Sequence, residues 1–160
     1  MNDESLAYFI TWTVYGTRLQ GDPRGWRKRR KGIQPPQPPL AQWRHERLKH
    51  SILLLDDTQQ AVVAKEIQKH CDHRGWRAWK INARTNHVHI VVTATGYAGD
   101  TVRDQCKANA TRGLRQQWRV FIDRPVWTVL GDWECINTED DLLAVVEYAG
   151  DAQDRMEYKE

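Results

Sequence analysis

Two segments of the chain alternate between residue types as half-buried strands do. Residues 8–15 and 87–95 are rich in aromatic and β-branched residues, and both are predicted strands. In the second segment, His87 and His89 share one face because side chains two positions apart point the same way. Val88, Ile90 and Val92 occupy the other face, which predicts that this strand is fixed to a core by its apolar side.

Capping residues and shorter apolar runs predict the remaining elements. Helices are expected over residues 57–74, 101–118 and 138–148. Further strands are expected at 51–55, 76–83 and 126–129, with a short connection at 84–86 and a turn region at 131–136. The order strand, helix, strand, strand, helix, strand predicts an α+β fold. It has one antiparallel sheet, a ferredoxin-like or RRM-like element order, and helices packed on one face.

The helix boundaries carry their own signals. Asp56, Asp57 and Thr58 offer N-cap side chains for the first helix, which should stop at Gly75. The second helix is expected to be interrupted at Gly113 and has a basic edge, formed by Arg103, Lys107, Arg112, Arg115 and Arg119.

A chain of 160 residues is long enough for one domain with a real core. Its main irregularity is a basic, proline-rich insertion at about residues 16–48, where residues 35–39 predict an extended, polyproline-like spacer. Long insertions of this kind are typical of functional loops or disordered segments.

The net charge of +3 conceals two opposed ends. Residues 1–50 contain ten Lys and Arg against four Asp and Glu, whereas residues 137–160 contain two against eight. The basic end is dominated by one run of eight residues with six cations and a tryptophan, which we expect to bind nucleic acid by neutralising phosphates and stacking on bases. A solvated loop without a partner is the alternative. The expected DNA-binding residues are Arg24, Trp26, Arg27, Lys28, Arg29, Arg30 and Lys31, with Arg103 and Lys107 from the second helix.

Several classes of protein are disfavoured. No stretch of 18 apolar residues is present and the first residues do not resemble a signal peptide, so a cytoplasmic, nucleoid-associated protein without membrane contact is expected. Cys71, Cys106 and Cys135 are odd in number and widely spaced, which indicates neither a disulfide framework nor a zinc ribbon.

The histidine pair is the main candidate for chemistry. Two imidazoles on one strand face can hold a divalent cation with part of its coordination sphere open. Mg²⁺ or Mn²⁺ would suit a site completed by oxygen ligands. Two histidines on a solvated strand face remain the alternative.

The run Asn86 to Val92 resembles the HUH motif of single-tyrosine DNA transposases, in particular the REP-associated branch. The opening residues 8–17 look like that family's first strand. Val126 to Thr128 and residues 138–148 look like its closing segment. The resemblance covers roughly Tyr8 to Gln153.

The resemblance implies an enzyme that nicks and rejoins single-stranded DNA beside hairpins, as a monomer or a homodimer. Tyr148 would be the nucleophile and would carry a 5′-phosphotyrosine intermediate. An ordinary tyrosine with a hydrogen-bonded hydroxyl is the alternative for Tyr148. A non-catalytic module that binds single-stranded nucleic acid is the alternative for the whole protein, although it would leave both histidines idle and the chain has no RRM-like aromatic motif.

The third metal ligand is where the chain departs from the resemblance. Related transposases have an amide four residues after the tyrosine, but Ala152 stands there and Gln153 lies one residue further. At 100° per residue, Gln153 would share the face of Tyr148 only if the helix unwound near Gly150. Gln153 is the preferred third ligand, and Asp151, which needs no distortion, is the alternative.

Overall fold

The central element of the structure is a four-stranded antiparallel sheet with strand order β4-β5-β1-β6. The computed structural model describes residues 5–17, 26–28, 32–34 and 37–151. The strands of this sheet are β1 (Ala7–Thr13), β4 (Arg77–Ala83), β5 (His87–Thr93) and β6 (Asp132–Ile136). The predicted α+β class with an antiparallel sheet is confirmed.

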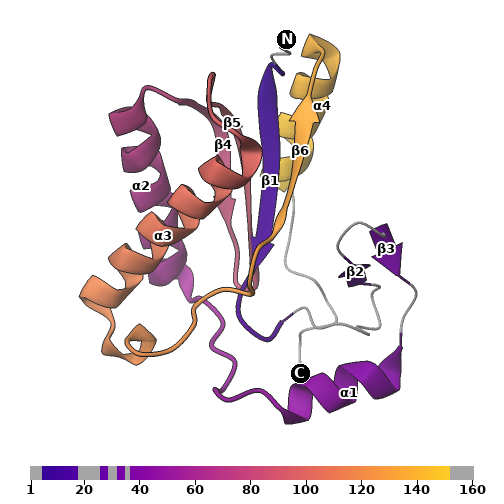
Figure 1. Cartoon of the computed structure of the whole chain (residues 1–160). Coiled ribbons are helices and arrows are strands. Elements are labelled where there is room, and N and C mark those ends of the chain that lie inside the picture. Colours follow the sequence, from indigo (N-terminus) through magenta and orange to yellow (C-terminus); the bar gives the residue numbers. More distant parts are fainter. Residues whose placement is uncertain (1–4, 18–25, 29–31, 35–36, 152–160) are drawn as a thin grey trace.

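The sheet has helices on both faces (Figure 1). Helices α2 (Asp57–Arg74) and α3 (Gly99–Gln117) cover the face that carries Val88, Ile90 and Val92. The predicted packing of helices on one face is confirmed for this pair. Helix α4 (Glu139–Asp151) adds a layer on the opposite face, where it packs against β4 and β5.

Helix α2 begins and ends where its capping residues predict. The backbone N–H of Gln59 donates to the Asp56 carboxylate at 2.8 Å, and the backbone N–H of Asp56 donates to the Gln59 side chain at 3.0 Å. This reciprocal pair satisfies two of the N–H groups that a helix start leaves open. Gly75 has φ of 76°, a left-handed conformation that glycine adopts without strain.

Gly113 does not interrupt α3, contrary to the sequence-based expectation. A Cβ atom at Gly113 would lie 2.4 Å from Cγ of Glu66 on α2. The missing side chain therefore lets the two helices pack closely, and that packing offsets the low helix propensity of glycine.

The last strand was predicted in the wrong place. Val126 and Trp127 are buried, and Trp127 forms only an isolated bridge with Val14, while its indole N–H donates to Thr111 at 2.9 Å. Strand β6 lies at 132–136, the expected turn region, and pairs with β1. Its first four residues are exposed, so the backbone ladder forms it without the apolar pattern that marks a buried strand.

Two further expectations are corrected. Residues 51–55 form no strand, although Leu55 is buried and its N–H donates to the Thr85 carbonyl at 2.9 Å. Pro38 and Pro39 do not form an extended spacer but begin helix α1 (Pro38–Glu46). Proline is tolerated in a first helical turn because the N–H that it lacks has no partner there.

The insertion also contains a small second sheet. Strands β2 (Trp26–Lys28) and β3 (Gly32–Gln34) pair antiparallel, apart from the main sheet (Figure 1). Pro35 and Pro36 lie outside the described residues.

Candidate functional site

The two histidines of β5 lie on the face of the sheet that α4 covers. His87 is 1% exposed and His89 is 3% exposed, and their ring centroids are 4.5 Å apart. The strand alternation that places them there also directs Val88 and Ile90 into the core with α2 and α3. The structure therefore brings both imidazoles into one small volume.

Each imidazole is held through Nδ1. The Nδ1 atom of His87 lies 2.7 Å from Oδ1 of Asn86, and the Nδ1 atom of His89 lies 2.9 Å from Oγ1 of Thr11. Because the Asn86 oxygen accepts a hydrogen bond, a neutral His87 carries its proton on Nδ1 and its lone pair on Nε2. A partner at one ring nitrogen that orients the other toward a cation is the usual arrangement of metal-ligating histidines.

Tyr148 lies beside this pair on the last turns of α4. Its ring centroid is 6.0 Å from that of His89 and 6.1 Å from that of Phe9. Phe9 on β1 also stacks on His89, with centroids 5.4 Å apart and an interplanar angle of 25°. Tyr148 is 58% exposed, so its hydroxyl can meet a macromolecular substrate from solvent. Phe9 thus contacts two of the predicted site residues, His89 and Tyr148.

The third ligand position falls largely outside the described residues. Gln153 lies beyond them, and Asp151 is the last residue of α4, with its backbone alone described. Within the described part of the chain, no cluster of three or more His, Cys, Asp or Glu side chains could hold a metal ion. Two imidazoles with anchored Nδ1 atoms nevertheless fit a divalent cation that takes its remaining ligands from oxygen atoms.

The basic run is described only in part. Arg24, Arg29, Arg30 and Lys31 lie outside the described residues. Trp26, Arg27 and Lys28 form strand β2, of which the structure gives the backbone. Their contact with DNA stays a prediction.

Arg103 and Lys107 use their charges within the protein. Arg103 is 6% exposed, and its Nε donates to the Asp104 carboxylate at 2.9 Å. The Lys107 ammonium donates to the Thr128 carbonyl at 2.9 Å. Burial lowers the pKa of Lys107 to about 8, and the nearby Arg103 charge acts in the same direction. Arg103 also donates to the Gly131 carbonyl at 3.3 Å, so both cations hold backbone carbonyls in the segment before β6. Their contact with DNA stays a prediction.

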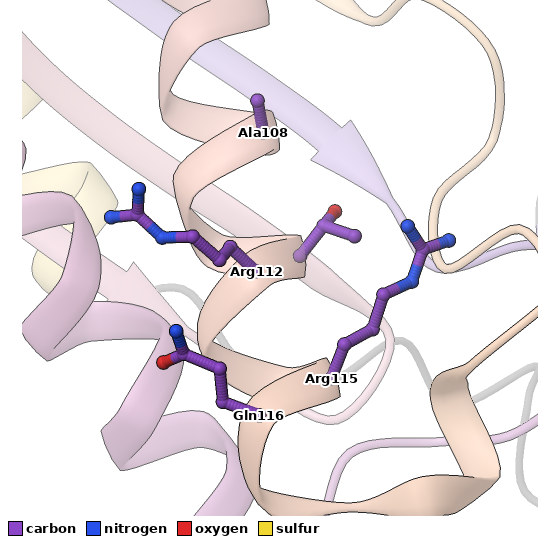
Figure 2. Close-up of a pocket in the computed structure, with 5 residues that line it drawn as sticks. Ala108, Arg112, Arg115 and Gln116 are labelled. Atoms are coloured by element: carbon purple, nitrogen blue, oxygen red, sulfur yellow. The ribbon is translucent and has the colours of Figure 1, made fainter.

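The outer face of α3 carries a hollow that was not singled out from the sequence (Figure 2). Its volume is about 420 Å³, and it is lined by Ala108, Thr111, Arg112, Arg115 and Gln116. Arg115 is held by the carbonyls of Phe121 at 3.0 Å and Arg124 at 2.8 Å. The basic edge of α3 is thus divided: Arg103 and Lys107 face the turn before β6, while Arg112 and Arg115 border the hollow.

Sequence reasoning missed the polar residues that support the histidines. Thr11 pairs with His89 across β1 and β5, and Asn82 pairs with His89 across β4 and β5. The alternation of β1 was visible, but the register that sets Thr11 opposite His89 depends on strand pairing. Asn86 begins the run that was recognised in the sequence, but the sequence did not show that this residue is buried and holds Nδ1 of His87.

Comparison with known proteins supports the fold. No model of a protein family matches the chain, and no curated protein matches it. A crystal structure from Deinococcus radiodurans R1, described as that of a candidate transposase, is similar, with a TM-score of 0.50 and 9% identity. The match covers 96% of this chain and 95% of the other. At this identity the likeness shows the fold alone, so the chain has a transposase-like α+β fold.

In the described residues, no helix has the length and apolar character needed to cross a membrane.

Proposed function

We propose that the protein is a metal-dependent endonuclease and strand transferase of the HUH single-tyrosine class, acting on single-stranded DNA. The observation that carries this proposal is the position of Tyr148, whose ring centroid lies 6.0 Å from that of His89 on the same face of the sheet. A nucleophile next to a pair of groups that can ligate a metal suits metal-assisted phosphodiester cleavage by a side chain. The likeness in fold to a candidate transposase agrees with it.

In the proposed reaction, the phenolic oxygen of Tyr148 attacks the scissile phosphorus. A bond forms between phosphorus and the Tyr148 oxygen, the bond from phosphorus to the 3′ oxygen breaks, and the 3′ oxygen takes up a proton. The phosphate stays attached to the 5′ oxygen of the downstream strand. The phenol proton passes to solvent, which reaches this exposed side chain. A later 3′-hydroxyl attacks the phosphotyrosine, restores a phosphodiester and releases Tyr148, so no external energy source is needed.

His87 and His89 would hold Mg²⁺ or Mn²⁺ through Nε2, with Gln153 or Asp151 as the third protein ligand. The bound cation supplies stabilisation of the charge that develops on the phosphate oxygens. Asn86 and Thr11 keep both imidazoles in the required orientation through their contacts with Nδ1.

The hollow on α3 would take the DNA backbone outside the cleavage site. None of its five lining residues is acidic or aromatic, so it favours phosphate and offers no surface for base stacking. The carboxylate of Glu66, whose side chain is 12% exposed, lies 3.9 Å from the Arg112 guanidinium, and the Arg112 side chain is 62% exposed, so much of its charged group faces solvent. A partner bound through its phosphates matches the duplex stem of a hairpin.

The test is formation of a covalent adduct. The protein is incubated with Mn²⁺ and a pool of single-stranded oligonucleotides that contain a constant hairpin and randomised flanks, and products are separated on a denaturing gel. We expect an adduct with the wild-type protein and none with Tyr148→Phe, which lacks only the phenolic oxygen and should still bind DNA.

Peptide mass mapping identifies the modified residue. An adduct at Tyr15, Tyr97 or Tyr158 would overturn the role of Tyr148. DNA binding by the wild-type protein with no adduct under these conditions would instead favour the non-catalytic binding module.

A further inference from the structure

Asn82 links the strand next to the histidines to the helix that carries the tyrosine. It lies on β4, directly opposite His89 in the β4–β5 register. Its side-chain Nδ2 donates to the backbone carbonyl of Ala149 at 2.7 Å. Ala149 follows Tyr148 in α4, so one hydrogen bond joins the neighbourhood of a predicted metal ligand to the backbone beside the predicted nucleophile.

The hydrogen bond from Asn82 lies at the C-terminal end of α4, where backbone carbonyls lack partners within the helix. The last four carbonyls of a helix have no partner within it, and Ala149 is two residues before the end of α4 at Asp151. Asn82 therefore caps one of these carbonyls from the sheet. Ala149 is fully buried, so its carbonyl would carry a desolvation cost without this donor.

The remaining contacts of α4 with the sheet are mainly apolar. Leu142 and Ala149 pack with Val91 in the small core on this face, together with the partly buried Val145 and Val146. Apolar packing holds a helix at a given distance from a sheet but is non-directional, so it restrains sliding and rotation only weakly. A short hydrogen bond depends on both distance and angle, and therefore fixes where along the sheet the last turn of α4 lies.

We propose that Asn82 is a positioning residue that sets the phenolic oxygen of Tyr148 relative to His87 and His89. This inference rests on the proposed function. Asn82 acts through the Ala149 carbonyl and takes no part in the chemistry. Loss of the bond lets the last turn of α4 shift, and a displacement of about 1 Å at a reacting group lowers a rate by about 100-fold.

The first measurement is the rate of adduct formation at saturating oligonucleotide and Mn²⁺. We expect Asn82→Ala to lower the maximal rate by about 10- to 100-fold, with little change in the concentrations of DNA and Mn²⁺ that give half the maximal rate. Asn82→Asp has the same shape but an ionised side chain that cannot donate, and should lose at least as much. Asn82→Gln keeps an amide donor and should recover part of the rate.

Asn109 offers a matched control. Its Nδ2 donates to the Gln105 carbonyl at 2.8 Å, which is also a bond from a side-chain amide to a backbone carbonyl but lies within α3. Its Oδ1 accepts from Arg112 at 2.9 Å, so this control is read at saturating oligonucleotide. Asn109→Ala should form adduct at the wild-type rate. An equal loss in both variants would contradict the positioning role and indicate general destabilisation.

A second measurement needs neither DNA nor metal. Amide hydrogen exchange in the last turn of α4 should be faster in Asn82→Ala than in the wild-type protein, while exchange in α2 and α3 stays the same. Absence of any adduct with the wild-type protein would overturn the proposed function itself. A normal maximal rate in folded Asn82→Ala, whatever its hydrogen exchange, would overturn only the role of Asn82.

Discussion

The two faces of the main sheet are built from the same strands but are filled differently. On one face, β1 and β5 contribute Ile10, Val88 and Val92, each fully buried under α2 and α3. On the other face, α4 covers a smaller apolar cluster, and the same strand β5 presents His87 and His89 next to the exposed Tyr148. Because the first face supplies most of the core, the second can keep polar groups close together without serving as the main source of stability.

This difference predicts that changes on the α4 face alter chemistry more than stability. His87→Ala and His89→Ala should each abolish detectable adduct formation and weaken Mn²⁺ binding by more than about 100-fold, because each removes a metal ligand. Calorimetric titration with Mn²⁺ measures the affinity.

Thr11→Val provides a graded comparison for the histidine variants. It removes the hydroxyl next to Nδ1 of His89 and leaves both imidazoles in place. We expect a loss of about 10-fold in Mn²⁺ affinity, as for other residues that orient a metal ligand. Unchanged Mn²⁺ binding in both histidine variants would show that the pair holds no cation.

The opposite face should give the reverse result. Ile90→Ala leaves a cavity under α2 and α3, since Ile90 is 1% exposed, and should lower the free energy of unfolding by about 2–5 kcal/mol. Urea unfolding measures this loss. The rate of adduct formation per folded molecule should stay at the wild-type value, and a large fall in that rate would mean that the two faces are not separable.

The smallest effect is expected at the hollow on α3. Arg112→Gln should reduce the slope of log K against log salt for a hairpin oligonucleotide by about 0.7–0.9, the value for one lost phosphate contact. Lys65→Gln, on an exposed position of α2 outside the lining residues, removes the same charge and should leave the slope close to that of the wild-type protein. Equal changes in the two variants would show that net charge, and not this hollow, sets the affinity.

Much of the fold could be predicted because its signals are local. The capping residues around Asp56 and Gly75 fix α2 through contacts between neighbours in the sequence. The alternation in β5 places His87 and His89 on one face in any sheet that forms. The sequence-based predictions were wrong where an element depends on a partner strand or helix. Residues 132–136 form strand β6 because β1 pairs with them, and α3 continues through Gly113 because α2 packs against it.

The candidate site shows the same limit. The sequence by itself predicted which side chains are candidates for chemistry: the two imidazoles, because alternate positions of a strand share one face, and the Tyr148 phenol, because the chain resembles single-tyrosine transposases. Only the tertiary structure decided what surrounds them. Strand register sets Thr11 and Asn82 opposite His89, and helix packing places Tyr148 beside the same ring. Both arise from contacts between residues far apart in the chain, and these depend on how several elements pack at once rather than on the pattern within any one of them.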